Sequence, residues 1–599
     1  MMRLIVFLLL ILQAFVSTSR AIPQRLILAL DGISYRDVQG LQRGINDTNL
    51  WGSVTHREAF TAAEGYFPVS RMVSTFPSTS DVAWTDIFGN RPLPGYQRTY
   101  YSVTANSEIA FNGLTTTVEH ERQMDWQARN NFARSMGYIY SVHTFEYELH
   151  KLMKTFWEGT GTNYYIYIRS SDDAQHMDRD ILSMLCMLDK DLQEMRARYK
   201  AQEGHDLQIV ILSDHGHNHA GRGERVQVRG FLEKNGYRIT QTIDGPKDVV
   251  LPTSGIEDWI EIHNAPSETQ HLAEALTRLQ GADVVAALLP KPPNTFLVLN
   301  SKGERALIRW NPQKNRLQYS VEQGDPLHYL PIVLTFAREK KLDANGFASA
   351  DDWMAATMTN HYPLALHRIV RGLTCVTLNP ATILVSLDNH YVHAGWWVNA
   401  GSELETCGST HGALDDINSL GIILTNFKPT HDMPTDQVAA FFDNFPGLRN
   451  YRDQENGAEW VVKNEQARVR IRRDPFDWEY KSLPGNGLFL RVWSPELAEA
   501  GTGVSLEAAI EKVSGVADPP AGPETLQPTL AHEIRVTFDN PISFSKTCPY
   551  ERVYACPKDL GLEPSAEYEI SGWVRGVNKD VARFEFVFQT DEQGHPVAY

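Results

Sequence analysis

The chain has 599 residues, more than a single hydrophobic core supports, so we expect two or three domains. Its hydrophobic share of 42% and charged share of 22% are those of an ordinary globular protein, and the lack of low-complexity or short-period repeats argues against a solenoid or a disordered scaffold. The formal net charge of −17 argues against binding to a nucleic-acid duplex, although bound metal ions can reverse the field inside a phosphate site.

The N-terminus has the pattern of a secretory signal. Arg3 precedes an apolar run, Leu4–Val16, which is shorter than the roughly 20 residues that span a bilayer. Ser19-Arg20-Ala21 then supplies small residues for a cleavage site. We therefore predict that residues 1–21 are a signal peptide and that the mature protein is secreted or periplasmic, with no stable membrane span. An uncleaved N-terminal anchor is the alternative.

The five cysteines fit an oxidising compartment. Cys548 and Cys556 bracket a short loop and could form a local disulfide. Cys375 and Cys407 could form a second, which would leave Cys186 unpaired. The sequence does not fix this pairing.

Four short apolar runs end in polar residues, which is the pattern of buried strands followed or preceded by turns. Segments of helical period lie between them, and Asp180–Arg198 is the clearest because its leucines fall on one face. Strands that alternate with helices predict an α/β fold with a mostly parallel sheet sandwiched by helices. The four runs are Arg25–Leu30, Tyr164–Ile168, Ile209–Leu212 and Leu420–Leu424.

Two regions look like additions to this sheet. Roughly 225–395 separates the third and fourth runs and has strands and helices of its own, so we predict an inserted cap subdomain within a catalytic domain of residues 22–455. From about 460 the pattern becomes strand-like, interrupted by a Pro-rich stretch at 518–528, and we predict a small β-rich C-terminal domain over 460–599. Its role is open, and a glycan or surface adhesin is one alternative. The strands expected there are Ala467–Arg472, Ile534–Phe538, Tyr568–Val574 and Ala582–Phe588.

Asp and His residues gather next to these strand ends, at the edge where open α/β sheets bind ligands. Carboxylate oxygen and imidazole nitrogen are suitable ligands for Zn²⁺, and Mn²⁺ accepts them as well. Asp172 and His176 are four residues apart and can project from one helical turn, while Gly216 permits a sharp turn after Asp214 and His215. Taken singly, each fits a common turn or a solvated helix face, so the prediction depends on their conjunction. The six residues are Asp31, Asp172, His176, Asp214, His215 and His411.

A hydroxyl nucleophile is also expected. Ser74–Ser78 precedes a helical stretch, Asp81–Ile87, and a hydroxyl at a helix N-terminus faces a ready anion site. Ser78, Thr79 or Ser80 could instead cap that helix. The two roles are compatible, because the cap geometry would help to hold a phosphate.

Five motifs in this order resemble those of the alkaline phosphatase superfamily, and the Thr-Phe-Pro element is most similar to its nucleotide pyrophosphatase/phosphodiesterase (type I phosphodiesterase) branch. The resemblance spans roughly 25–430, and the insertion falls where that branch carries one. Gly324-Asp325-Pro326-Leu327, followed by Tyr329, is similar to a motif of bacterial members. The five motifs are Leu28-Ala29-Leu30-Asp31-Gly32, Thr75-Phe76-Pro77, Asp172-x-x-x-His176, Ser213-Asp214-His215-Gly216 and Thr410-His411-Gly412.

The resemblance implies a hydrolase of phosphate esters with two divalent metal ions. Zn²⁺ is the metal expected first, and Mn²⁺ is the alternative. Thr75 would contact both metals and act as the nucleophile, and water would then hydrolyse a phospho-threonine intermediate. The residues implied for one metal are Asp31, Asp214 and His215, and those for the other are Asp172, His176 and His411.

The chain departs from the branch after the proposed nucleophile. Family members often read Thr-Phe-Pro-Asn-His, whereas Ser78 and Thr79 stand in the last two places here. The branch also has a phosphate-binding Asn further along the chain, where this sequence has Tyr96 and Gln97.

Other side chains near these motifs are candidates for substrate contact. Arg91 and Arg98 could each grip a phosphate by two donors. His217 and His219 extend the Asp-His-Gly segment, and we expect them to be solvated loop residues.

We therefore expect a phosphodiesterase or nucleotide pyrophosphatase that acts on a small phosphate ester or nucleotide. A phosphomonoesterase or a phosphoryl-type transferase on the same two-metal site is the enzymatic alternative, because the missing Asn leaves the diester preference open. A sulfatase is disfavoured because Cys-x-Pro-x-Arg is absent from the sequence. An exported binding protein on an inactive scaffold is the alternative outside enzymes, and the complete set of ligand-type residues disfavours it.

Overall fold

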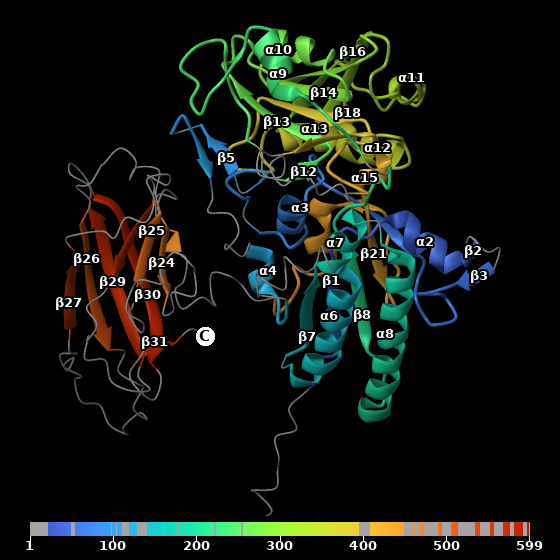
Figure 1. Ribbon diagram of the computed structural model, residues 1–599, viewed down its shortest axis with the longest axis vertical. Coiled ribbons are helices and arrows are strands. Elements are labelled where there is room, and N and C mark those ends of the chain that lie inside the picture. Colours follow the sequence, from blue (N-terminus) through green and yellow to red (C-terminus); the bar gives the residue numbers. More distant parts are fainter. Residues whose placement is uncertain are drawn as a thin grey trace, which may run out of the picture.

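Figure 1 shows the computed structural model of the chain. The structure describes residues 22–448 except 49–53, 91, 98, 104, 111–118, 128–139, 160, 178, 221–222, 253–254 and 395–407, and beyond 448 only the strands given below. The predicted signal peptide and three of the cysteines (Cys407, Cys548 and Cys556) lie outside the described residues. Cys186 and Cys375 form no disulfide with each other. Within the described part, none of the helices has both the length and the apolar character needed to cross a bilayer.

A six-stranded sheet forms the base of the α/β part, in the order β22-β4-β21-β8-β1-β7. Strand β1 pairs in parallel with β7 and with β8, and β22 pairs in parallel with β4. Strand β21 is antiparallel to both β8 and β4, so it runs against the other five. The predicted mostly parallel sheet is thus confirmed. The strands are β1 (Arg25–Leu30), β4 (Ser70–Val73), β7 (Asn163–Ile168), β8 (Gln208–Ser213), β21 (Leu420–Thr425) and β22 (Met433–Pro434).

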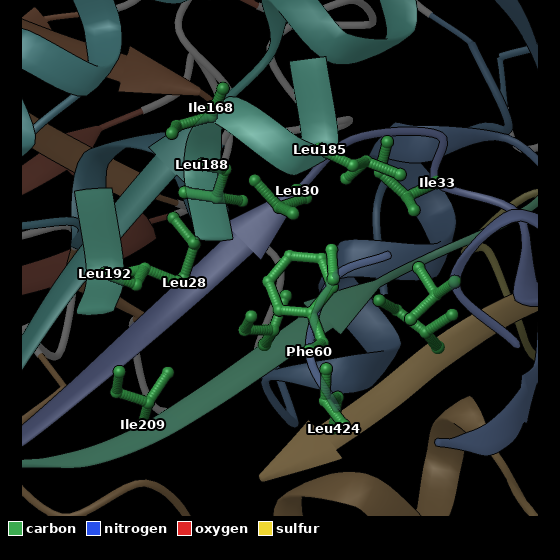
Figure 2. Close-up of a cluster of buried hydrophobic side chains, with 14 of the residues drawn as sticks. Leu28, Leu30, Ile33, Phe60, Ile168, Leu185, Leu188, Leu192, Ile209 and Leu424 are labelled. Carbon is green, nitrogen blue, oxygen red and sulfur yellow. The ribbon is translucent and has the colours of Figure 1, made fainter. Parts of the chain in front are cut away.

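Helices cover both faces of this sheet because side chains alternate along its strands. Leu28 and Leu30 of β1 pack with Leu188 of helix α8 on one face, and Figure 2 shows this cluster. Ala29 of β1 packs with Trp84 of helix α3 on the other face. The helices on the first face are α2 (Tyr35–Arg43), α6 (Ser141–Thr155) and α8 (Ile181–Glu203), and those on the second are α3 (Ser80–Ile87) and α16 (Thr435–Phe441).

A second, nine-stranded sheet lies between β8 and β21 in the sequence, inside the region predicted as an insertion. Its order is β10-β11-β13-β19-β14-β15-β16-β17-β18, and its pairs are antiparallel except for β10 with β11. Figure 1 shows it, in green and yellow, beyond the carboxyl ends of β1 and β8. Its strands are β10 (Arg238–Ile239), β11 (Asp248–Val250), β13 (Trp259–Asn264), β14 (Ala282–Leu289), β15 (Thr295–Asn300), β16 (Arg305–Asn311), β17 (Arg316–Gln323), β18 (Ala348–Ser349) and β19 (Ile383–Leu387).

The two faces of the nine-stranded sheet have separate hydrophobic cores. One core includes residues of α9 and α10. The other includes residues of α11, α12 and α13 together with Phe76, which comes from the segment that precedes α3. The inserted part therefore packs directly against the predicted nucleophile segment. These helices are α9 (Val228–Lys234), α10 (Thr269–Leu276), α11 (Leu330–Arg338), α12 (Ala350–Thr357) and α13 (Ala365–Gly372).

Small sheets and short helices complete the α/β part. A three-stranded sheet has the order β12-β20-β9, and two hairpins pair β2 with β3 and β5 with β6. The strands are β2 (Ile45–Thr48), β3 (Val54–Arg57), β5 (Thr99–Ser102), β6 (Ser107–Ala110), β9 (Glu224–Arg225), β12 (Ile256–Glu257) and β20 (Tyr391–Ala394), and the short helices are α4 (Glu119–Gln123), η1 (Phe156–Glu158), α7 (Ser170–His176) and α15 (Asp416–Ser419).

Beyond residue 448 the described residues form two antiparallel sheets, in the orders β23-β24-β25-β28 and β27-β26-β29-β30-β31. All four strands expected from the sequence are present among them. The first sheet contains β23 (Trp460–Val461), β24 (Arg468–Arg472), β25 (Phe489–Trp493) and β28 (Glu551–Ala555), and the second contains β26 (Ser505–Lys512), β27 (Glu533–Phe538), β29 (Glu567–Arg575), β30 (Asp580–Thr590) and β31 (Pro596–Val597).

Candidate metal centre

The polar residues next to the strands meet at one edge of the six-stranded sheet. Asp31 comes directly after β1, Asp172 lies in α7 after β7, and Asp214 comes directly after β8. Because these strands are parallel, their carboxyl ends share an edge. His411 instead precedes β21, and because β21 is antiparallel to β8, its beginning reaches the same edge. Because β21 is reversed, His411, which precedes it, meets the Asp residues that follow β1, β7 and β8.

The first group contains Asp31, Asp214 and His215, all buried, with candidate ligand atoms within 4.8 Å of one another. His215 Nε2 lies 3.3 Å from Asp214 Oδ2 and 3.8 Å from Asp31 Oδ1. The Tyr167 hydroxyl donates to Asp31 Oδ2, and Trp84 Nε1 donates to Asp31 Oδ1 at 3.4 Å. Asp214 Oδ2 is buried and accepts no hydrogen bond from any described residue.

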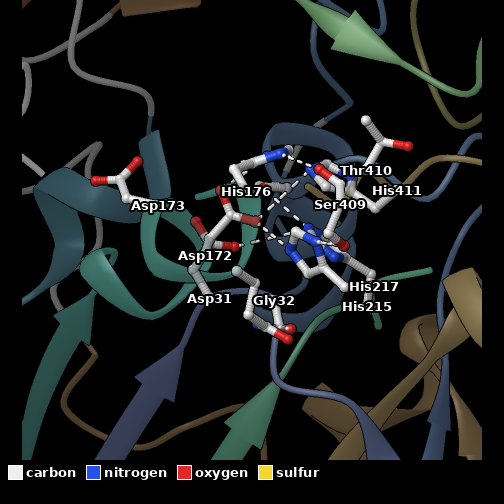
Figure 3. A network of polar contacts seen from close by, with 12 residues as sticks. Asp31, Gly32, Asp172, Asp173, His176, His215, His217, Ser409, Thr410 and His411 are labelled. Atoms are coloured by element: carbon white, nitrogen blue, oxygen red, sulfur yellow. Dashed lines mark hydrogen bonds and ion pairs between the residues drawn. The ribbon is translucent and has the colours of Figure 1, made fainter. Parts of the chain in front are cut away.

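The second group contains Asp172, His176, His217 and His411, which are buried and again within 4.8 Å of one another. Figure 3 shows the three imidazole rings converging on the Asp172 carboxylate. His217 Nε2 lies 2.7 Å from Asp172 Oδ1, and His411 Nε2 lies 3.7 Å from the same oxygen. His176 Nε2 lies 3.4 Å from Asp172 Oδ2.

The two groups adjoin each other. The rings of His215, from the first group, and His411, from the second, stack with centroids 3.8 Å apart and an interplanar angle of 19°. Two cation sites could therefore lie side by side, as a two-metal centre requires.

The hydrogen bonds of the histidines leave a lone pair at each inward nitrogen. In three of them Nδ1 contacts a main-chain oxygen, which can only accept, so we assign the proton to Nδ1 and the lone pair to Nε2. Each Nε2 faces a carboxylate oxygen, and two electron-rich atoms repel unless a cation lies between them. Metal-binding histidines are held in this way, and the donor set suits Zn²⁺. The contacts are His176 Nδ1 to the Ser409 oxygen at 2.8 Å, His215 Nδ1 to the Gly216 oxygen at 3.1 Å and His411 Nδ1 to the Ser78 oxygen at 3.0 Å.

Burial also disfavours charge on these side chains. It raises the pKa of Asp31 to about 7, with a further increase from the charge of Asp172. It raises the pKa of the Asp214 carboxyl well above its usual value. Burial lowers the pKa of His215 to about 4 and that of His411 well below its usual range. A divalent cation requires neutral imidazoles and ionised carboxylates as ligands, and its own charge would keep Asp31 and Asp214 ionised.

The expectation that His217 is a solvated loop residue is wrong. Its side chain is only 1% exposed, and it belongs to the second group. His219 is exposed, as expected, and its main-chain N–H donates to Ser409 Oγ at 3.1 Å. The spacing of two residues between His215 and His217, which is the side-chain period of an extended chain, was the available signal.

Gly216 serves the site in a different way from the one expected. Its backbone is not left-handed. A Cβ atom at this position would instead lie 2.3 Å from the Ile417 oxygen, and the Gly216 N–H donates to the Asn418 oxygen at 3.0 Å. The glycine therefore allows the segment after β8 to approach the segment before β21.

The segment between β4 and α3 carries the candidate hydroxyls. Thr75 Oγ1 donates to the Pro77 oxygen at 2.7 Å. Ser80 Oγ lies 3.1 Å from His215 Nε2. Thr79 is the N-cap residue of α3, but its hydroxyl makes no cap bond, and its buried Oγ1 has no hydrogen-bond partner among the described residues. The hydroxyl in contact with the first group is thus that of Ser80 and not that of Thr75.

The other predicted substrate residues are not part of these groups. Arg91 and Arg98 lie outside the described residues. Tyr96 is 1% exposed; its hydroxyl donates to the Gly372 oxygen and accepts from the Ala381 N–H at 3.0 Å. Tyr96 thus packs in the hydrophobic core of the inserted part, although it precedes that part in the sequence.

The motif that begins at Gly324 forms hydrogen bonds at the start of α11, in the inserted part. The Asp325 carboxylate accepts from the main-chain N–H groups of Tyr329 and Leu330, at 3.0 and 2.7 Å, where α11 begins. The Tyr329 hydroxyl accepts from the Ala365 N–H at 3.0 Å, which ties α11 to the first turn of α13.

One protein family and several solved structures are similar to this chain. Residues 31–328 match the family described as type I phosphodiesterase / nucleotide pyrophosphatase. No match is found among curated proteins. Among solved structures, human ectonucleotide pyrophosphatase/phosphodiesterase 5 is similar at 11% identity and a TM-score of 0.36, over 71% of this chain and 95% of that one. The murine protein is similar at 10% identity and a TM-score of 0.35, over 71% and 95%. So is an inactive variant of the murine protein in complex with AMP, at 10% identity and a TM-score of 0.35, over 71% and 96%. Through residues 31–328 the chain belongs to the type I phosphodiesterase / nucleotide pyrophosphatase family, as its motifs predict, and it is a hydrolase acting on phosphoric ester bonds.

Proposed function

We propose that the chain is a two-metal phosphodiesterase or nucleotide pyrophosphatase whose ions are bound at the edge of the six-stranded sheet. The observation that carries this proposal is the direction of the imidazole lone pairs, each facing a buried carboxylate oxygen. Zn²⁺ is the metal that this mixture of imidazole and carboxylate favours. The proposed ligands of one ion are Asp31, Asp214 and His215, and those of the other include Asp172, His176 and His411.

The protein supplies a buried and oriented ligand set for this chemistry. When bound, a pair of divalent ions lowers the pKa of an attacking hydroxyl and stabilises the oxygen of the leaving group. The Tyr167 hydroxyl orients Asp31, and the main-chain oxygens of Ser409 and Ser78 orient His176 and His411. The N-terminus of α3 adds a partial positive charge, which favours a phosphate at that end of the helix.

We propose Thr79 as the nucleophile in place of Thr75. The residues on either side of Thr79 contact both groups, because the Ser78 oxygen accepts from His411 and Ser80 Oγ contacts His215. Thr79 therefore lies where the groups meet, and its hydroxyl is not engaged in capping α3. The Thr75 hydroxyl is engaged with its own segment.

The proposed reaction has two displacements at phosphorus. The Thr79 oxygen bonds to phosphorus while the bond from phosphorus to the leaving oxygen breaks, and that oxygen belongs to an alkoxide in a diester or to a phosphate in a pyrophosphate. The hydroxyl proton passes to solvent, and an alkoxide leaving group takes a proton from solvent. Water then attacks the phospho-threonine, which releases a phosphate monoester and restores the hydroxyl. In this second step the bond from phosphorus to the Thr79 oxygen breaks, the threonine oxygen takes a proton and the attacking water loses one.

Nucleotides are the proposed substrates, because the family is named for their pyrophosphate bonds. The inserted part packs against the segment that carries Thr79 and is the proposed source of leaving-group specificity. Arg91 and Arg98 stay proposed phosphate contacts.

We propose that residues 1–21 direct export and that residues 460–599 form a separate β-rich domain. Export fits a metal site of imidazoles and carboxylates, which has no thiolate to oxidise. N-terminal sequencing of the exported protein should begin at Ile22, and a sequence that begins at Met1 would show that the signal is retained.

A pair of chromogenic esters tests the proposed activity. The full-length protein should hydrolyse bis-p-nitrophenyl phosphate faster than p-nitrophenyl phosphate. A chelator should abolish the activity, and added Zn²⁺ should restore it. A faster reaction with the monoester would favour a phosphatase, and hydrolysis that persists in chelator would contradict the two-metal site.

A further inference from the structure

His217 has a place in the second group that the family's ligand set does not explain. It lies two residues after His215, on the segment that follows β8, and its side chain is buried. Its Nε2 lies 2.7 Å from Asp172 Oδ1, closer than the Nε2 atom of either His176 or His411 lies to that carboxylate.

The ring of His217 is anchored through Nδ1, as the other rings are, but its partner is a hydroxyl in place of a main-chain oxygen. Its Nδ1 lies 3.0 Å from Ser409 Oγ, and the main-chain oxygen of Ser409 accepts from His176 Nδ1. One residue therefore orients two rings. The His217 ring lies 4.9 Å from that of His176 and 5.1 Å from that of His411, between centroids, and its Nε2 is directed at the same carboxylate as theirs.

The turn after β1 packs closely against His217 and Asp172. A Cβ atom at Gly32, which has φ +71°, would lie 2.8 Å from both Asp172 Oδ1 and His217 Nε2. Only glycine lets the turn after β1 approach this pair so closely. The fold thus holds the His217 nitrogen at the ligand atoms of the second group.

We propose that His217 Nε2 is a fourth protein ligand of the ion held by Asp172, His176 and His411. The inference rests on the proposed function. Three imidazoles and one carboxylate complete a tetrahedral zinc site, whereas the three residues of the first group leave a position open for substrate. The ion of the second group should therefore bind more tightly, and the substrate should approach the ion of the first group, next to Ser80.

Metal affinity and X-ray absorption at the zinc edge test this role without a substrate. The full-length protein, loaded with two equivalents of Zn²⁺, is compared with His217→Ala, His217→Asn and His217→Cys, and with His219→Ala as the control. Asn keeps a donor towards Asp172 but is a poor zinc ligand, whereas Cys is a strong one.

His217→Ala and His217→Asn should each lower the affinity for one equivalent by more than about 100-fold, beyond the cost of losing a partner that only orients a ligand. The imidazole contribution to the absorption spectrum should fall in both. His217→Cys should restore tight binding and add a sulfur neighbour at about 2.3 Å. His219→Ala should have the same metal affinity and absorption spectrum as the unaltered protein.

Unchanged affinity and an unchanged spectrum in His217→Asn would overturn the inference, because they would reduce His217 to a hydrogen-bond partner of Asp172. That result would leave the proposed function intact if the unaltered protein binds two equivalents. An unaltered protein that binds no metal would instead overturn both.

Discussion

Arg368 Nη2 donates to the main-chain oxygen of Thr75 at 3.0 Å and to Ser78 Oγ at 3.0 Å. Arg368 comes from α13 of the inserted part and is only 2% exposed. Its Nη1 donates to the Leu414 oxygen at 2.6 Å, three residues beyond His411. Burial lowers the pKa of this guanidinium to about 9. One buried side chain thus fixes both the hydroxyl segment and the segment that carries a proposed metal ligand.

Replacement of Arg368 by Met should therefore lower kcat about 100-fold, because a shift of about 1 Å at the reacting groups costs that much. Metal content should stay at the level of the unaltered protein, since no proposed ligand is removed. Arg338→Met, on an exposed part of α11, is the matched control. Steady-state kinetics of the folded variants would contradict the positioning role if kcat were unchanged.

Thr79→Ala should lower diester hydrolysis by about 1,000-fold or more, the scale seen when a nucleophile is removed. The rate of diester hydrolysis by Thr75→Ala should stay within about tenfold of that of the unaltered enzyme. The reason is that Arg368 contacts the main-chain oxygen of residue 75 and not its hydroxyl. The test combines kinetics with mass spectrometry of the acid-quenched enzyme, which should locate the phosphoryl group on Thr79. A phosphoryl group on Thr75 would restore the assignment that the family resemblance implies, and one on Ser80 would move the nucleophile by one residue.

His411→Ala should lose about one metal equivalent, because it removes one of the ligands on the second ion. Its ring also stacks on His215, so the affinity for the remaining ion should weaken as well. Elemental analysis after dialysis gives the metal content, with His431→Ala, an exposed residue, as the control. If His411→Ala still binds two equivalents tightly, His411 is not a ligand of the second ion.

Stability should depend on the ionisation of Glu148, a buried carboxyl that accepts hydrogen bonds from Ser170 at the start of α7. Burial raises its pKa from 4.5 to about 8. Because the native state binds this proton more tightly than the unfolded chain does, the contribution of Glu148 to the free energy of unfolding falls as the pH rises from about 4.5 to about 8.

Glu148→Gln, which keeps an acceptor oxygen but cannot ionise, should reduce this decline, so that the variant gains stability relative to the unaltered protein at pH 8 and not at pH 4. Denaturant unfolding at both pH values measures the difference. An equal difference at both pH values would show that the effect of the substitution does not arise from ionisation.

The core strands were predictable because each is a continuous apolar run that ends in polar residues. Arg25–Leu30 has the bounds expected of it, and Leu420–Leu424 differs from β21 by one residue. The direction of β21 was not predictable, because an apolar run has the same composition whichever way it runs. That direction depends on its partners β8 and β4, and it decides how His411 reaches the site.

The sequence predicted the Asp and His ligand types of the candidate site. It did not predict the burial of His217 or which hydroxyl lies at the site. Asp31 and Asp214 are ligand-type residues at strand ends, where the chain topology alone brings them together. The two-residue spacing from His215 indicated only that His217 could face the same way, and its burial depends on where its segment lies relative to Asp172. The choice among Thr75, Thr79 and Ser80 depends on the path of a loop that Arg368 holds from the distant inserted part.

The two buried Asp and His groups should bind two adjacent metal ions. Anomalous diffraction at the zinc edge, from crystals of the full-length protein grown with Zn²⁺, tests this most directly. We expect two peaks about 4 Å apart, which is the spacing of two-metal centres. One should lie among Asp31, Asp214 and His215 and the other among Asp172, His176, His217 and His411. A single peak, or none, in crystals of the active enzyme would contradict this expectation.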